Sequence, residues 1–171
     1  IPRPEPPEHW IPHLQGIEAV VNCAGALQDG PSDSLNGVHS VGIGPMFAAC
    51  EALGIRRVIH FSAIGVGRET PTDFSRTKLH GDQKLIASQL DWVILRPSVV
   101  LGRPVYGASA LFRALAILPI LPVMPNTGSL QVVQLEEVVK TALHFLDQGA
   151  AHRIALDLAG PVRLSFSEVV Q

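Results

Sequence analysis

The stretch VIHFS at residues 58–62 decides the fold class. Its first four residues are β-branched or aromatic, and it ends shortly before the turn Gly65-Val66-Gly67, so it predicts a strand buried on both faces. Further strands are expected at three places: EAVVNCA at 18–24, WVIL at 92–95 and RIALDL at 153–158.

Helical patterns separate these runs. Apolar residues recur at helical spacing over 38–53, where Gly54 is a good helix stop and Pro45 should kink or restart the helix. Further helices are expected at four places: 74–88, 109–118, 135–146 and, from a capping box, 165–171. Buried strands between amphipathic helices predict an α/β fold with a doubly wound parallel sheet.

The composition limits the class of protein. The chain has 171 residues, 47% of them apolar and 16% charged, and its net charge is −2. That length suits one domain with its own core, and the charge disfavours nucleic acid as a partner. The apolar stretch from Ala114 to Pro125 has twelve residues and three prolines, which is too short to span a membrane.

The two cysteines, Cys23 and Cys50, form no disulfide framework and cannot build a zinc site by themselves. We therefore expect a cytoplasmic protein without a metal. Residues 1–13 hold five of the fourteen prolines, and they are expected to form an irregular linker and not a helix. The sequence starts without Met, so we expect that its natural beginning is missing.

Ligands of such sheets bind at the carboxyl ends of the strands. The candidate ligand-binding segments are therefore Ala24-Gly25-Ala26, residues 62–65 and Pro97-Ser98-Val99. Their small residues would allow a ligand to approach the backbone closely, but they would also suit tight turns. There is no phosphate loop ending in Gly-Lys-Ser/Thr and no Gly-x-Gly-x-x-Gly, and Ser62 is not in a nucleophile elbow. His60, inside a strand, is interpreted as a packed core histidine.

Five motifs occur in a telling order: VVNCAG at 20–25, VIHFSA at 58–63, FSRTK at 74–78, LRPSVVLG at 95–102 and LAGP at 158–161. In this order and spacing the chain resembles the extended and atypical short-chain dehydrogenase/reductase superfamily. Within it, the chain is similar to the NAD-dependent epimerase/dehydratase-like and nitrogen-metabolite-repressor-like branch, which includes the accessory nucleotide-binding subunit of respiratory complex I. The resemblance covers residues 17–171.

The resemblance implies a Rossmann-like fold, NAD or NADP as the cofactor, and one domain over residues 1–171. Residues 1–16 would be a proline-rich lead-in, 17–105 the nucleotide-site half and 106–171 the elements of a C-terminal substrate lobe. The implied cofactor contacts are Ala24, Gly25, Ser62, Lys78, Pro97, Ser98 and Val99. Lys78 would hold the nicotinamide ribose, and Lys78 with Ser62 would be the catalytic residues.

The chain departs from the catalytic pattern of the superfamily. Tyr-x-x-x-Lys is replaced by Phe74-x-x-x-Lys78, and the usual catalytic Ser or Thr falls near Ile64. Losing a positioned proton donor costs about 10²–10⁴-fold in rate. Three functions stay open: an oxidoreductase or epimerase/dehydratase-like enzyme of unusual mechanism, a non-catalytic nucleotide sensor or assembly subunit, and an α/β binding domain unrelated to dinucleotides.

The resemblance also implies that the first three strands and the glycine-rich pyrophosphate turn lie upstream of Ile1. We therefore expect this chain to contact mainly the nicotinamide half of a dinucleotide, with an affinity weaker than micromolar. The bare edge of the strand at 18–24 should be covered, by a second copy, by a further segment of polypeptide or by the proline-rich start. An apolar surface over 115–124 would suit an apolar small-molecule substrate or a protein partner.

Overall fold

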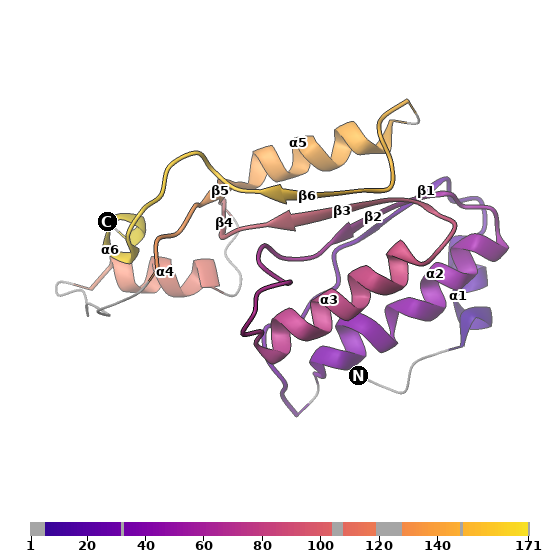
Figure 1. Ribbon diagram of the computed structural model, residues 1–171, viewed down its shortest axis with the longest axis horizontal. Helices are drawn as coiled ribbons and strands as arrows, with labels where there is room; N and C mark the ends of the chain where they lie inside the picture. Colours follow the sequence, from indigo (N-terminus) through magenta and orange to yellow (C-terminus); the bar gives the residue numbers. More distant parts are fainter. Residues whose placement is uncertain (1–5, 32, 104–107, 119–127, 148, 171) are drawn as a thin grey trace.

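The computed structural model describes residues 6–31, 33–103, 108–118, 128–147 and 149–170. Its main sheet is parallel and has the strand order β1-β2-β3-β6 (Figure 1). The bounds of these strands are Ala19–Asn22, Arg57–Phe61, Asp91–Pro97 and Ile154–Leu158. All four lie where the apolar runs predict them.

Helices cover both faces of the sheet (Figure 1). On one face lie α2 (Ile43–Ala52) and α3 (Asp73–Ile86), and on the other lies α5 (Leu135–Leu146). The central strands contribute alternate residues to two separate cores, so that Val58 packs with the α2 side and Ile59 with Phe145 of α5. The predicted doubly wound α/β class is confirmed.

A small lobe lies beyond the carboxyl ends of the strands (Figure 1). It contains a two-stranded sheet and two short helices: β4 (Val100–Leu101), β5 (Val133–Gln134), α4 (Ala108–Ala116) and α6 (Phe166–Val170). The predicted capping box is present, since Ser165 N–H donates to Glu168 Oε2 and Glu168 N–H donates to Ser165 Oγ. Ile117 and Leu118 are exposed as expected, whereas 119–124 lie outside the described residues.

The expectation of an irregular proline-rich start is wrong. Residues Pro7–Leu14 form the helix α1, which packs against α2 (Figure 1). Pro7 stands in the first turn, where its missing N–H would have no helical partner, and Pro12 removes only one hydrogen bond from a helix this short. Burial of Leu14, with Trp10 packed beside the core, outweighs that loss.

The predicted helix over 38–53 is two helices. A π-helical turn, η1 (Gly37–Val41), ends at Gly42, and α2 begins directly after it. Pro45 is tolerated because it stands in the first turn of α2. The predicted stop is confirmed: Gly54 has a φ of +73°, and its N–H donates to Glu51 O.

In the part of the chain that the structure describes, the proline-rich start forms α1 on α2 and does not cover the edge of β1. Among the described residues, β1 pairs only with β2. An apolar groove of about 450 Å³ lies between β1 and α5, and Val21 and Leu143 on its walls are 40% and 60% exposed. Cover by a second copy or by a further segment stays a prediction. No helix in the described part of the chain has the length and apolar character that crossing a bilayer requires.

Candidate functional site

Lys78 lies at the carboxyl ends of β1 and β2, where its side chain is almost fully buried. Its Nζ donates to Phe61 O at 2.8 Å and approaches Ala24 O at 3.5 Å. A Cβ added to Gly25 would lie 3.5 Å from the same Nζ, an ordinary contact distance, so the loop passes directly over the ammonium. The structure thus brings together three predicted cofactor contacts, Ala24, Gly25 and Lys78.

Phe74 lies one helical turn before Lys78 on α3 and is half-buried. Its ring meets His39 edge-on, with a centroid distance of 5.4 Å. It therefore faces η1, one turn from Lys78 on α3. Its position relative to a nicotinamide stays a prediction.

His39 connects α3 to the loop after β1. Its Nε2 accepts from Ala26 N–H at 3.0 Å, so Nδ1 carries the proton and donates to Thr77 Oγ1 at 2.9 Å. This arrangement needs a neutral ring. Burial, followed by the Lys78 ammonium, lowers the pKa of His39 to about 4.

His60 is buried between the sheet and α3, as its position in a strand predicted. Asn22 Oδ1 accepts from Ala24 N–H, so the Asn22 amide nitrogen donates to His60 Nδ1 at 3.0 Å. The protonated Nε2 of His60 then faces Asp82 Oδ1 at 3.6 Å. Burial, with Lys78 and His39 nearby, lowers the pKa of His60 to about 3.

Asp82 is fully buried one turn after Lys78. Its Oδ2 accepts from Arg96 Nε at 3.1 Å and Nη2 at 2.9 Å. Burial raises the pKa of the Asp82 carboxyl, and the Ser62 hydroxyl and Arg96 oppose that shift. Among the described residues, Ser62 Oγ is buried without a hydrogen bond of normal geometry, although its hydroxyl influences the Asp82 carboxyl.

The backbone at Pro97, Ser98 and Val99 is partly engaged in the sheet. Pro97 O accepts from Ile64 N–H at 3.2 Å, Ser98 N–H donates to Leu158 O at 2.8 Å, and Val99 O accepts from Val133 N–H at 3.0 Å. These bonds fix the segment rigidly at the end of β3. They leave fewer free groups for a carboxamide than the sequence suggested.

The two buried histidines predict that stability falls on mild acidification. A histidine whose pKa is about 4 or 3 when folded binds its proton more readily when unfolded, where the pKa is about 6.5. Between pH 6.5 and pH 5 each should remove about 1.5 kcal/mol from the free energy of unfolding. The raised pKa of Asp82 acts in the opposite direction. Urea unfolding at both pH values measures the change.

The matched variant for this measurement is His39→Gln, which keeps a polar side chain but does not titrate. Between pH 6.5 and pH 5, the free energy of unfolding of this variant should fall by about 1.5 kcal/mol less than that of the unchanged chain. An equal loss in both proteins would show that His39 is not held neutral.

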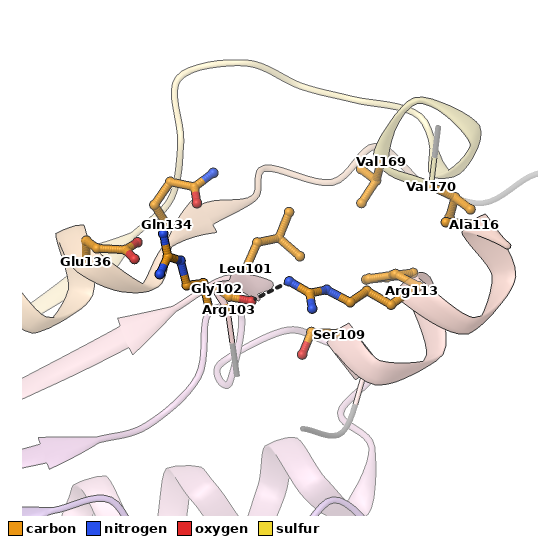
Figure 2. A pocket seen from close by; sticks show the side chains of 11 residues that line it. Leu101, Gly102, Arg103, Ser109, Arg113, Ala116, Gln134, Glu136, Val169 and Val170 are labelled. Carbon is orange, nitrogen blue, oxygen red and sulfur yellow. Dashed lines mark hydrogen bonds between the residues drawn. The ribbon is translucent and has the colours of Figure 1, made fainter. Parts of the chain in front are cut away.

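A pocket of about 410 Å³ opens beyond β3, in the small lobe (Figure 2). Leu101 of β4 is one of its lining residues. Because Leu101 is only two residues after Val99, the pocket adjoins the segment that we expect to contact the nicotinamide. Figure 2 shows Arg113 reaching from α4 to donate to Gly102 O at 3.0 Å. Sequence reasoning did not find this pocket, because β4 and β5 have only two residues each and carry no pattern.

Sequence reasoning also missed three polar residues around Lys78: His39, Asp82 and Arg96. The signal for Asp82 was present, since a residue four after Lys78 shares its helix face. No such signal marks His39 or Arg96, whose partners are distant in sequence. Among the described residues no group of three or more His, Cys, Asp or Glu could hold a metal ion.

Comparison with known proteins gives one family match. A family model described as NAD(P)H-binding matches residues 5–112. Among curated proteins, the ceramide reductase of Caulobacter vibrioides is 22% identical over 131 residues, which are 77% of this chain and 41% of that protein.

Solved structures share the fold. UDP-glucuronic acid 4-epimerase from Bacillus cereus, solved with NAD, aligns with a TM-score of 0.79 at 17% identity, over 92% of this chain and 58% of that one. The Bordetella bronchiseptica enzyme WbmG, solved with NAD and UDP, gives 0.76 at 17% identity, over 96% and 58%. The chain thus spans well under two thirds of the length of these proteins.

Proposed function

The chain belongs to the family of NAD(P)H-binding proteins, and from that premise we propose that its buried Lys78 contacts the nicotinamide ribose of NAD or NADP. Membership confirms the predicted superfamily and the predicted class of cofactor. The placement of Lys78 carries the proposal. An ammonium has three donors, and carbonyls of the β1 and β2 ends accept two of them, which leaves one for a ribose hydroxyl.

The remaining contacts follow from the same end of the sheet. Ala24 and Gly25 form a small-residue surface above Lys78, and the Cβ direction of Gly25 points at Lys78 and His39. Pro97, Ser98 and Val99, fixed at the end of β3, lie beside the carboxamide. Ser62 stays a catalytic candidate in this proposal, and the support for it is that its hydroxyl influences the buried Asp82 carboxyl.

We propose binding without the usual tyrosine-dependent chemistry as the principal activity. Phe74 occupies the tyrosine position on the Lys78 face of α3, and a phenyl ring cannot transfer a proton. A sensor or assembly subunit fits this arrangement. The third reading, a domain unrelated to dinucleotides, is removed by family membership.

A reductase of unusual mechanism is the second candidate. The pocket that adjoins the end of β3 favours it, since a cofactor-side site with a neighbouring cavity can place a substrate next to the nicotinamide. The name of the curated relative, a ceramide reductase, agrees with such an activity.

The domain division and the partners are also proposals. We assign residues 17–105 to the nucleotide half and propose that 106–171 supply elements of a substrate lobe, namely α4, β5 and α6, besides α5 and β6 of the main layer. The helix α1 is part of the core and not a linker. The bare β1 edge suits a homo-oligomer, and exposed Ile117 and Leu118 suit an apolar small molecule or protein partner. The two free cysteines support a cytoplasmic location.

Titration with halves of the cofactor tests the proposed binding. Nicotinamide mononucleotide should bind nearly as well as NADH, at a dissociation constant weaker than micromolar, and AMP should bind far more weakly. Lys78→Met should weaken mononucleotide binding about tenfold, since a charge-assisted hydrogen bond is lost. The binding of all three ligands is measured by following the amide chemical shifts of the purified chain during each titration.

The control for Lys78 is Lys84→Met, on the same helix but away from the strand ends. It should leave binding unchanged. Stronger binding of AMP than of the nicotinamide half, or an unaffected Lys78→Met variant, would show that the contacts are placed at the wrong half.

A further inference from the structure

The pocket in the small lobe has two chemically different ends (Figure 2). Polar side chains lie around β4 and β5, close to the main sheet, and apolar side chains lie between α4 and α6, farther from it. Its volume of about 410 Å³ is within the range of small-molecule sites, roughly 300–1,000 Å³.

The polar end carries an excess of positive charge. Two guanidinium groups, Arg103 and Arg113, line it with one carboxylate, Glu136. Arg113 gives one N–H of Nη2 to Gly102 O, so its fork is oriented while other N–H groups face the cavity. Gln134 lies at the same end. Such a donor set suits an anionic oxygen-bearing group.

The apolar end is a wall of hydrocarbon side chains. It is built from Phe112 and Ala116 of α4 and from Val169 and Val170 of α6. Phe112 is held in place by Phe166, whose ring meets it edge-on with a centroid distance of 5.7 Å. No charged side chain lines this end, so it can desolvate a hydrocarbon chain.

We infer that this pocket binds an amphiphilic anion, with a carboxylate or similar group at Arg113 and Arg103 and an alkyl chain between α4 and α6. The inference rests on the proposed function, because it gives the adjoining site its substrate class. The polar end lies on the side of Leu101, two residues beyond the proposed carboxamide contacts. A functional group near the head of the ligand would therefore be next to the nicotinamide.

The apolar groove between β1 and α5 is a weaker candidate for this ligand. It has a comparable volume, about 450 Å³, but its described walls hold no arginine, lysine or histidine. It can take a neutral hydrocarbon but offers nothing to an anionic head. Charge therefore discriminates between the two cavities.

Two probes with a ten-carbon chain and one short probe test the inference on the purified protein by calorimetry. Decanoate should bind at least tenfold more tightly than decyltrimethylammonium, which has the same chain and the opposite charge. Acetate, which has the charge without the chain, should not bind measurably. Equal binding of both decyl probes would overturn the assignment.

Variants locate the binding. Ala116→Trp fills the apolar end and should weaken decanoate binding at least tenfold, whereas Ala114→Trp, exposed on the same helix outside the pocket, should not. Arg113→Gln should weaken decanoate binding about tenfold, since a charged hydrogen bond is lost, and Arg163→Gln should leave it unchanged.

Leu143→Glu places a negative charge in the apolar groove between β1 and α5. If it abolishes binding while Ala116→Trp does not, the pocket is wrongly chosen.

Titration of the same samples with nicotinamide mononucleotide separates this inference from the proposed function. Mononucleotide binding without decanoate binding overturns the inference alone. Decanoate binding without mononucleotide binding overturns the proposed function and leaves the pocket as an amphiphile site.

Discussion

A tyrosine in place of Phe74 should raise the rate of carbonyl reduction by at least about a hundredfold. The residue lies one helical turn before Lys78, on the side of α3 that faces η1. A phenol there would be close to the Lys78 ammonium, which favours its ionised form and so assists proton transfer. The measurement is oxidation of NADH or NADPH by decanal and by 9,10-phenanthrenequinone, at saturating dinucleotide.

Two controls separate proton transfer from repacking. Phe74→Leu also disturbs the contact with the His39 ring but carries no hydroxyl, so it should give no gain. Adding Lys78→Met to Phe74→Tyr should remove most of the gain and shift the alkaline limb of the pH–rate profile upward. If Phe74→Tyr binds dinucleotide normally yet is as slow as the unchanged chain, the motif is aligned wrongly.

Most of the fold was predictable because its strands are buried on both faces. Runs such as VIHFS at 58–62 are short and dominated by β-branched and aromatic residues, and Gly54 ends a helix in the left-handed conformation that a glycine adopts freely. Helix α1 was missed for the opposite reason. Its prolines oppose a helix locally, and only tertiary burial of Leu14 against the core reveals why it forms.

The site was predictable in part. Lys78 and Gly25 follow from motif order, and the structure brings them together although 53 positions separate them in the numbering. The polar groups that fix Lys78 were not predictable, because each contact joins segments that no local pattern relates. His39 meets Thr77, Asn22 meets His60 and Arg96 meets Asp82 only after the sheet and α3 have packed. Tertiary packing, and not propensity, selects these partners.

The close approach of η1 and α3 is the contact that positions these groups. Gly81 of α3 faces the carbonyl of His39, and a Cβ added there would overlap with that oxygen and lie 3.0 Å from Ile43 Cδ1. A backbone carbonyl cannot rotate away as a side chain can. The absence of a side chain at Gly81 therefore sets the distance between the helix that carries Lys78 and the turn that carries His39.

Gly81→Ala should consequently lower the free energy of unfolding by about 3 kcal/mol, since overpacking against backbone must move one element. This is opposite to the usual preference for Ala over Gly inside a helix, which is worth up to about 1 kcal/mol. Gly44→Ala in α2 is the matched control, because its added Cβ would meet only the flexible Lys84 side chain at 3.5 Å, and it should be neutral or stabilising. Urea unfolding measures both.

The folded fraction of Gly81→Ala should also bind nicotinamide mononucleotide more weakly, because displacement of η1 moves His39 and with it the Ala26 loop. A Gly81→Ala chain as stable as Gly44→Ala would mean that η1 and α3 do not approach as closely as their backbones indicate.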